Sequence, residues 1–278
     1  NYKKLNEIVK KEKPEIIFHL AAQSIVSESF INPLKTINSN VIGSANILET
    51  VKNNNINALV YVTSDKCYLN TGTKKSFKEN DTLGGFDNYS SSKASAEILF
   101  HSYFHSFFKN NEKISAATAR AGNVIGGGDF KNNRIVPDFF RAISKNKTML
   151  IRNPKATRPW QHVLEPLSGY LKLGSLLLNK KINSNIYPSW NFGPHKINCK
   201  EVIEVIGMFY NFLSINKKVK IIQNKKLVEA NFLSLNIKKA QKELNWHPRL
   251  TLKECVKFTA EWYRNFYSKT NLEYFTHS

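Results

Sequence analysis

Apolar runs alternate with amphipathic segments through the first half of the chain. Residues 3–12 carry apolar side chains at helical spacing, Pro14 ends that helix, and the apolar run at 16–22 predicts a buried strand. The same alternation predicts a helix at 33–53, a strand at 58–63, a helix at 89–109 and a strand at 116–121. Strands that are apolar throughout and alternate with helices are typical of a parallel sheet covered on both faces, so an α/β fold is predicted.

The pattern is less regular after the glycines at 126–128. It predicts a short strand near 190–193 and helices near 134–145, 163–178, 199–213, 236–245 and 251–267. We therefore expect two domains, residues 1–130 and a smaller one of mixed α/β structure at 131–278. The helix near 163–178 and the strand near 190–193 are expected to return to the first domain, so that the two domains interleave.

The composition excludes several classes of protein. The 278 residues are 41% hydrophobic, which is enough for a buried core, yet no run approaches the ~18–20 apolar residues of a membrane helix. The three cysteines, Cys67, Cys199 and Cys255, are far apart, so neither a disulfide framework nor a structural zinc site is expected. His101 and His105 share a helix without a third ligand, and no metal is expected there. We expect a soluble cytoplasmic protein.

The formal net charge of +20 raises the question of a nucleic-acid partner. The excess is mostly lysine, spread along the chain in pairs such as Lys10–Lys11 and Lys74–Lys75, and it forms no arginine-rich stripe. We therefore expect neither nucleic acid nor a membrane as a partner. A small anionic substrate would use the same field to speed its encounter with the protein.

Small and polar residues follow three of the predicted strands. Ligands of open parallel sheets bind beyond the carboxyl ends of the strands, so these residues are candidates for a site. The candidates are Ala21, Ala22 and Gln23 after the first strand, Ser64, Asp65 and Lys66 after the second, and Asn123 after the third. The small alanines would let a flat ligand approach the backbone. The glycines at 122–128 do not have Gly-x-Gly-x-x-Gly spacing, so no pyrophosphate is assigned to them.

Tyr89 and Lys93 are one helical turn apart and share a helix face. An ammonium that close stabilises a phenolate, which a tyrosine with a usual pKa of about 10 needs in order to act as a base near neutral pH. Such pairs also occur on many solvent-exposed helices, and Asp65–Lys66 alone is compatible with a surface turn. The position of the pair between two polar strand ends favours one shared cleft.

These motifs together resemble the extended short-chain dehydrogenase/reductase superfamily, through the Ala-Ala after a strand, the Ser-Asp strand end and Tyr-x-x-x-Lys. Within it the chain is similar to the NAD-dependent nucleotide-sugar 4,6-dehydratases, and among these to the branch that acts on CDP-glucose. The stretches that carry the resemblance are 63–68, 120–129, 151–154, 158–170, 190–194 and 245–248. The resemblance implies a Rossmann-like, doubly wound parallel sheet with its first strands missing, followed by a smaller substrate domain.

The resemblance also implies an internal redox cycle in which NAD accepts a hydride from C4 of the sugar and returns it to C6. Tyr89, its pKa lowered by Lys93, would take the proton of the C4 hydroxyl, and Ser64 would hydrogen-bond to the C4 oxygen. Asp65 would protonate the departing C6 hydroxyl. Lys66 stands where the dTDP-glucose dehydratases have Glu, so Lys66 or a neighbour would handle the C5 proton. The product is a 4-keto-6-deoxy sugar made for deoxysugar and surface-polysaccharide biosynthesis.

Further residues take their expected roles from the same resemblance. The expected NAD-binding residues are Ala21, Ala22, Gln23, Asn40, Tyr89 and Lys93. The expected substrate-binding residues are Asn123, Arg134, Arg152 and Arg158, because a forked guanidinium suits the diphosphate of a nucleotide sugar. The family also implies a homodimer formed through the helices near 33–53 and 89–108.

The chain departs from the family pattern at its start. Family members begin with a strand and a Gly-x-x-Gly-x-x-Gly turn over the NAD pyrophosphate, whereas this chain opens without Met at a helix. We therefore expect an N-terminally truncated fragment, inactive on its own, in which the strand at 16–22 has an open apolar edge.

Three functions stay open. The first is CDP-glucose dehydration, and the second is the activity of a sibling enzyme, a 4-epimerase or a dTDP- or GDP-sugar dehydratase. Asp65–Lys66 favours dehydration, because an epimerase eliminates no water. The third is a cofactor-free remnant that binds nucleotide sugars or a partner protein.

Overall fold

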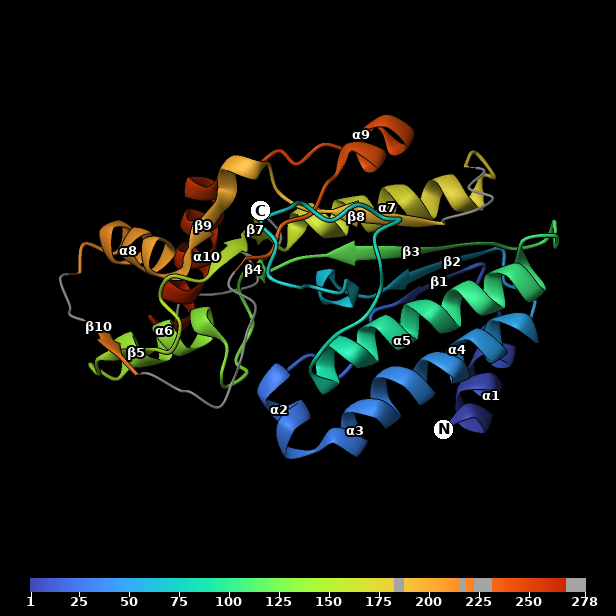
Figure 1. Ribbon diagram of the computed structural model, residues 1–278, viewed down its shortest axis with the longest axis horizontal. Coiled ribbons are helices and arrows are strands. Elements are labelled where there is room, and N and C mark those ends of the chain that lie inside the picture. The colour runs from blue at the N-terminus through green and yellow to red at the C-terminus, as the bar shows by residue number, and fades with distance from the viewer. Residues whose placement is uncertain (183–187, 216–218, 223–231, 269–278) are drawn as a thin grey trace. The chain divides into compact units, whose positions relative to one another are not determined.

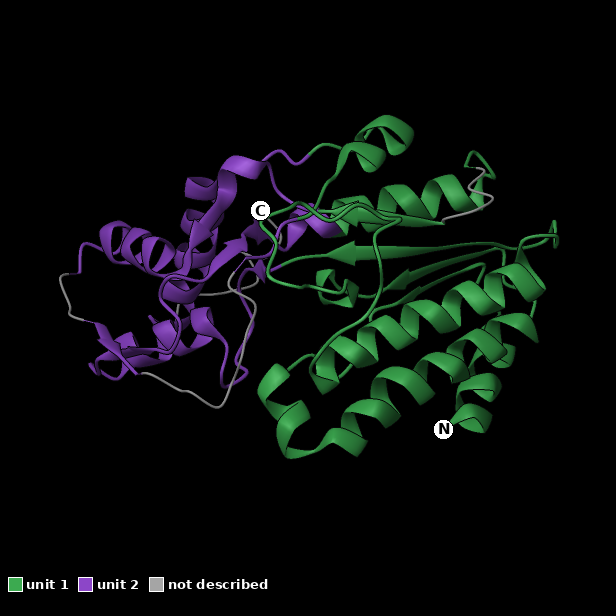
Figure 2. Cartoon of the chain, in the orientation of Figure 1, with its two compact units in different colours: residues 1–122, 167–192, 235–247 green, residues 123–166, 193–234, 248–278 purple. Residues whose placement is uncertain are grey.

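The computed structural model describes residues 1–182, 188–215, 219–222 and 232–268 (Figure 1). The chain forms two compact units, each built from three segments of the sequence (Figure 2). Unit 1 comprises residues 1–122, 167–192 and 235–247, and unit 2 comprises residues 123–166, 193–234 and 248–278. Across the described ranges, the structure contains no helix that is long and apolar enough to cross a membrane.

The described residues of unit 1 form a four-stranded parallel sheet with the strand order β1-β2-β3-β8. The strands are β1 (Ile16–His19), β2 (Ala58–Val62), β3 (Ser115–Ala121) and β8 (Ser189–Phe192). The parallel sheet predicted from the apolar runs is confirmed. The predicted end of the first strand at residue 22 is wrong, because the ladder with β2 stops where His19 pairs with Tyr61 and Leu20 is already exposed.

Helices cover both faces of this sheet (Figure 1). One face carries α1 (Tyr2–Glu12), α4 (Gly43–Lys52) and α5 (Asn88–Tyr103), and the other carries α7 (Leu164–Leu178) and α9 (Lys238–Leu244). Successive residues of β2 point to opposite faces of the sheet. Leu59 and Tyr61 therefore pack in the core beneath α1, α4 and α5, whereas Ala58 and Val60 pack in the core beneath α7 and α9. Because both faces are buried, the strand is apolar without interruption.

The helix predicted at 33–53 is present but irregular. It consists of α3 (Pro33–Ile37), a π-helical turn η1 (Asn38–Ile42) and α4, with Pro33 at its first turn as predicted. A short helix α2 (Val26–Ile31) precedes it, which the pattern did not predict. The helix predicted at 89–109 is α5 followed by a second π-helical turn, η3 (Phe104–Phe108).

Strand β1 lies at an edge of the sheet in the described part of the chain, as expected from the sequence. It pairs with β2 on one side, and all four of its residues are half-buried. An edge strand presents backbone N–H and C=O groups that a ladder would otherwise pair.

Unit 2 has its own core between α6 (Ile135–Ser144), α8 (Val202–Phe212) and α10 (Leu252–Tyr267). Aromatic rings fill it, with Phe140 stacked on Tyr263 at 4.2 Å between ring centroids. Where the structure describes unit 2, it also contains three short strand pairs: β5 (Met149–Ile151) with β10 (Val219–Ile221), β6 (Thr157–Pro159) with β9 (Cys199–Glu201), and β4 (Val124–Ile125) with β7 (Gln161–His162). A 3₁₀ turn, η4, spans Lys196–Asn198. Strands of two or three residues are too short to show a period in the sequence.

The glycines that follow β4 have a packing role in unit 2. A Cβ atom on Gly127 would lie 2.1 Å from the indole of Trp262, and Gly128 has a positive φ of 78°. The backbone at Gly127 therefore lies directly against the Trp262 ring of α10, and a side chain at this position would require the ring to move.

Candidate active site

The end of β2 leads into a tight polar turn. Ser64 caps the 3₁₀ turn η2 (Asp65–Cys67), with its hydroxyl oxygen accepting from the backbone N–H of Lys66 at 3.3 Å. The same hydroxyl donates to Oδ1 of Asp65 at 3.1 Å. Asp65 is 2% exposed and Ser64 8%, whereas Lys66 is half-buried. The turn thus presents a hydroxyl, a carboxylate and an amine from three consecutive residues.

Helix α5 brings the predicted Tyr89–Lys93 pair to this turn. Asp87 caps the helix by accepting from the Ser90 N–H at 2.9 Å, which places Tyr89 in the first turn, and α5 packs against η2. Both side chains are 6% exposed, and Nζ of Lys93 lies 6.0 Å from the centre of the Tyr89 ring. Burial lowers the pKa of Lys93 to about 8, because the ammonium loses its hydration, and nearby Cys67 and Glu97 oppose that shift.

The loop after β1 is held by Asn40 of η1. The backbone N–H of Gln23 donates to Oδ1 of Asn40 at 2.8 Å, and the amide of Asn40 donates to the Gln23 carbonyl and to the Ser92 hydroxyl at 3.0 and 2.9 Å. Asn40 is 3% exposed, whereas Ala21 and Ala22 are exposed. Asn40 therefore fixes the loop to α5, and the alanines leave its backbone open.

Three further polar residues of unit 1 were not predicted from the sequence. His19 ends β1, and burial together with the charge of Lys93 lowers its pKa to about 4. Glu97 and Arg120 are fully buried and form an ion pair. The sequence did contain a signal for this ion pair. An arginine inside the apolar run 116–121 requires a buried partner, and Glu97 lies one helical turn after Lys93.

The four residues expected to bind substrate all lie in unit 2. Arg134 forms an ion pair with Asp129 at 2.8 Å, and Arg152 donates to the carbonyl of Asn133 at 3.3 Å, so these two arginines lie along one stretch of backbone. The carbonyl of Asn123 accepts from the Gln161 N–H at 3.2 Å. Arg158 is 4% exposed within β6.

A parallel sheet with a Ser-Asp-Lys turn after one strand and a Tyr-x-x-x-Lys pair on the next helix defines an α/β enzyme of the short-chain dehydrogenase/reductase type. The chain belongs to the GDP-mannose 4,6-dehydratase family, whose model matches residues 1–259. It is 39% identical over 269 residues to the CDP-glucose 4,6-dehydratase of Salmonella typhimurium, covering 95% of this chain and 74% of that protein. The resemblance stated from the sequence motifs is confirmed.

Two of the solved structures that share the fold are an epimerase and a dehydratase. UDP-glucose 4-epimerase of Thermotoga maritima, solved with UDP-glucose, has a TM-score of 0.81 at 19% identity, covering 96% of this chain and 82% of that one. The dTDP-glucose 4,6-dehydratase of Bacillus anthracis, solved in complex with NAD, has a TM-score of 0.79 at 23% identity, covering 95% of this chain and 77% of that one. The predicted Rossmann-like fold is thereby confirmed.

Proposed function

We propose that the protein dehydrates CDP-glucose to CDP-4-keto-6-deoxyglucose in the biosynthesis of deoxysugars for surface polysaccharides such as O-antigen. The observation that carries the proposal is Asp65, a buried carboxylate beside Ser64 on the turn against which α5 packs. The similarity to a CDP-glucose 4,6-dehydratase over 95% of the chain supports the choice of substrate.

NAD is the cofactor of this proposal, and when bound it would supply the acceptor for the hydride from C4 of the sugar and the donor of that hydride to C6. The residues of unit 1 fit such a group. The exposed Ala21 and Ala22 leave the backbone beyond β1 open to a flat ring, and Asn40 holds Gln23 in place beside them. We assign these four residues, with Tyr89 and Lys93, to the nicotinamide side of the site.

Acid–base chemistry is assigned to the residues around η2. Tyr89 takes the proton of the C4 hydroxyl, and the ammonium of Lys93 stabilises the resulting phenolate. Ser64 would turn its hydroxyl hydrogen from Asp65 to the C4 oxygen when the sugar binds. Asp65 protonates the C6 hydroxyl as it leaves, which a carboxyl group held out of water is suited to do. Lys66 is the candidate for the C5 proton, because it is the next side chain of the same turn.

Unit 2 supplies the nucleotide-sugar ligands in this proposal. Arg134 and Arg152 would bind the diphosphate, with Arg134 exchanging its ion pair with Asp129 for the phosphate oxygens. Asn123 and Arg158 complete the proposed set.

The buried acid at Asp65 also separates this proposal from 4-epimerisation. An epimerase moves a hydride at C4 without eliminating water, so it has no use for a proton donor at C6. The fold shared with an epimerase does not decide between the two reactions, because both use the same sheet.

A homodimer and a cytoplasmic location are proposed as well. Large apolar side chains are exposed along the helices expected at the dimer interface; they are Leu34, Ile37, Ile42, Ile98 and Phe107. Light scattering of the purified protein tests the dimer, and a monomeric mass would reject it. Cys67, Cys199 and Cys255 are free thiols, which is typical of a reducing compartment.

The experiment for the proposed function compares nucleotide sugars in the complete gene product. We expect CDP-glucose, and not dTDP-glucose, to give a 4-keto-6-deoxy product by mass spectrometry. Asp65→Asn is expected to retain oxidation at C4, seen as NADH absorbance, and to lose elimination of water. Turnover of dTDP-glucose alone would reject the substrate, and full dehydration by Asp65→Asn would reject the assigned acid.

A further inference from the structure

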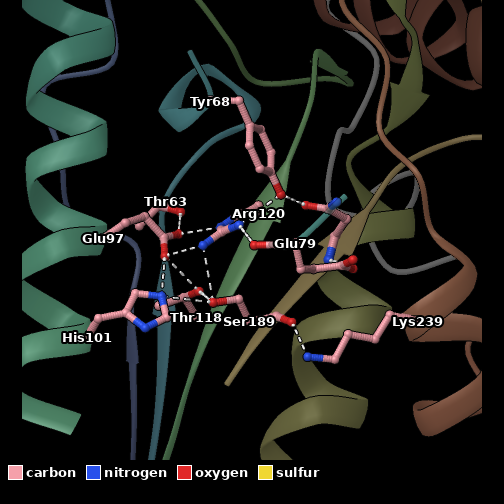
Figure 3. Close-up of polar contacts among 10 residues, drawn as sticks. Thr63, Tyr68, Glu79, Glu97, His101, Thr118, Arg120, Ser189 and Lys239 are labelled. Carbon is pink, nitrogen blue, oxygen red and sulfur yellow. Dashed lines mark hydrogen bonds and ion pairs between the residues drawn. The ribbon is translucent and has the colours of Figure 1, made fainter. Parts of the chain in front are cut away.

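Unit 1 contains a fully buried ion pair, Glu97 with Arg120, which is separate from the proposed catalytic residues. Glu97 of α5 and Arg120 of β3 are both 0% exposed, and they pair through two parallel hydrogen bonds (Figure 3). Nε of Arg120 donates to Oε1 of Glu97, and Nη2 donates to Oε2, each at 2.8 Å. This forked geometry is the strongest form of a carboxylate–guanidinium pair.

Every N–H of the Arg120 guanidinium has a partner. Besides its two bonds to Glu97, it donates to the Tyr68 hydroxyl at 2.8 Å, to the Glu79 carbonyl at 2.9 Å and to the Ser189 hydroxyl at 3.2 Å. Glu97 in turn accepts from the hydroxyls of Thr63 and Thr118. Burying two charges is costly, and here these bonds offset the cost.

The partners of the pair adjoin the proposed catalytic residues on both sides. Figure 3 shows Thr63 bonded to Glu97 and Tyr68 bonded to Arg120. Thr63 directly precedes Ser64, and Tyr68 directly follows the turn that carries Asp65 and Lys66. Glu97 itself lies one helical turn after Lys93 on α5. The pair is thus bonded to the two residues that flank the segment 64–67, and Glu97 itself belongs to the helix that carries Tyr89 and Lys93.

We propose that Glu97 and Arg120 are positioning residues that fix η2 against α5, and so set the placement of Asp65 relative to Tyr89 and Lys93. The inference deepens the proposed function and rests on it. Two apolar residues could fill the same space and hold the fold, as replacements of buried ion pairs in other proteins do, but they would not fix the orientation of both neighbours. A small displacement of catalytic groups, about 1 Å, is enough to lower a rate about 100-fold.

The test is the double variant Glu97→Leu/Arg120→Met in the complete gene product, which leaves no unpaired buried charge. We expect it to fold, with a melting temperature lowered because the Thr63 hydroxyl and the Glu79 carbonyl each lose a buried partner, to keep KM for the nucleotide sugar, and to lose about 100-fold in kcat. The single variant Arg120→Lys, which keeps the charge but not the fork, is expected to lose kcat as well. Glu49→Gln, which breaks the partly exposed ion pair with Lys52, is the matched control and is expected to leave kcat unchanged.

A kcat within about threefold of the parent in the folded double variant would overturn the proposal, as would a loss carried wholly by KM. A crystal structure of the double variant gives a readout that needs no activity. We expect the turn 64–68 to be displaced relative to Tyr89, and an unchanged turn would overturn the inference even if the parent proved inactive on every nucleotide sugar. Inactivity of the parent would reject the proposed function alone.

Discussion

Replacing Lys93 by Met is expected to stabilise the folded protein while removing its activity. Lys93 is 6% exposed, and burial lowers its pKa from 10.5 to about 8. At ~1.4 kcal/mol per pH unit, holding the charged form in this site costs about 3 kcal/mol. Met has a similar length and no charge, so Lys93→Met removes that cost and is expected to raise the free energy of unfolding at pH 7 by about that amount.

The stability gain must depend on pH in a defined direction. Between pH 8 and pH 10.5 the unfolded chain binds more protons at Lys93 than the folded chain does, so the parent becomes more stable as the pH rises through this window. The difference between the two proteins is therefore expected to shrink from about 3 kcal/mol at pH 7 to about 1 kcal/mol at pH 10.

Urea denaturation followed by circular dichroism, at pH 7 and at pH 10, measures this difference directly. The control is Lys52→Met, which breaks a partly exposed pair with Glu49 and is expected to change the free energy of unfolding by less than about 1 kcal/mol. A Lys93→Met protein that is less stable than the parent, or a gain that is the same at both pH values, would refute the reasoning. The same variant is expected to lose turnover, because Tyr89 loses the charge that stabilises its phenolate.

Two further predictions concern other parts of the molecule. In unit 2, Gly127→Ala is expected to lower the free energy of unfolding, measured by urea denaturation, by about 1–3 kcal/mol, since its Cβ would lie 2.1 Å from Trp262. The control is Gly207→Ala in α8, whose Cβ would meet open space, so it is expected to be neutral or stabilising. Equal effects of the two substitutions would contradict the packing argument. In unit 1, His19 has a pKa lowered from 6.5 to about 4, so the unfolded chain binds more protons between these values and stability is expected to fall as the pH drops through them. A His19→Asn variant should lose that part of the acid sensitivity, and an identical pH dependence of its melting temperature would count against the assignment.

The sheet of unit 1 could be predicted from the sequence because both of its faces are buried. Uninterrupted apolar strands and amphipathic helices have distinct periods, and β2, β3, α4 and α5 fall within a residue or two of their predicted bounds or continue through a π-helical turn. The π-helical turn at 38–42 was not predictable, since a single turn of five residues is too short to show a period of its own in the sequence.

The proposed site could be predicted only in part from the sequence. Ser64, Asp65, Tyr89 and Lys93 stand out because their spacing relative to strands and helices has a chemical meaning. The hydrogen bonds that hold these residues in place could not be predicted from the sequence, since Arg120 bonds to Glu97 across 23 residues of sequence and to Ser189 across 69. Such pairings follow from strand order, which local patterns do not encode. In unit 2, the strands are too short for their pairing to be inferred from periodicity.

The order in which the sheet of unit 1 is assembled from the sequence has a consequence for biosynthesis. Strand β8 and helix α9 come from 189–192 and 238–244, yet Trp190, Phe192 and Trp246 fill the core on one face of a sheet whose other strands end at residue 121. A ribosome delivers the chain from its N-terminus, so this face of the nascent sheet is completed only when α9 follows, more than a hundred residues after the end of β3. The contacts that close it have long sequence separation, which slows folding, and a chaperone that shields apolar surface would act on the chain during that interval.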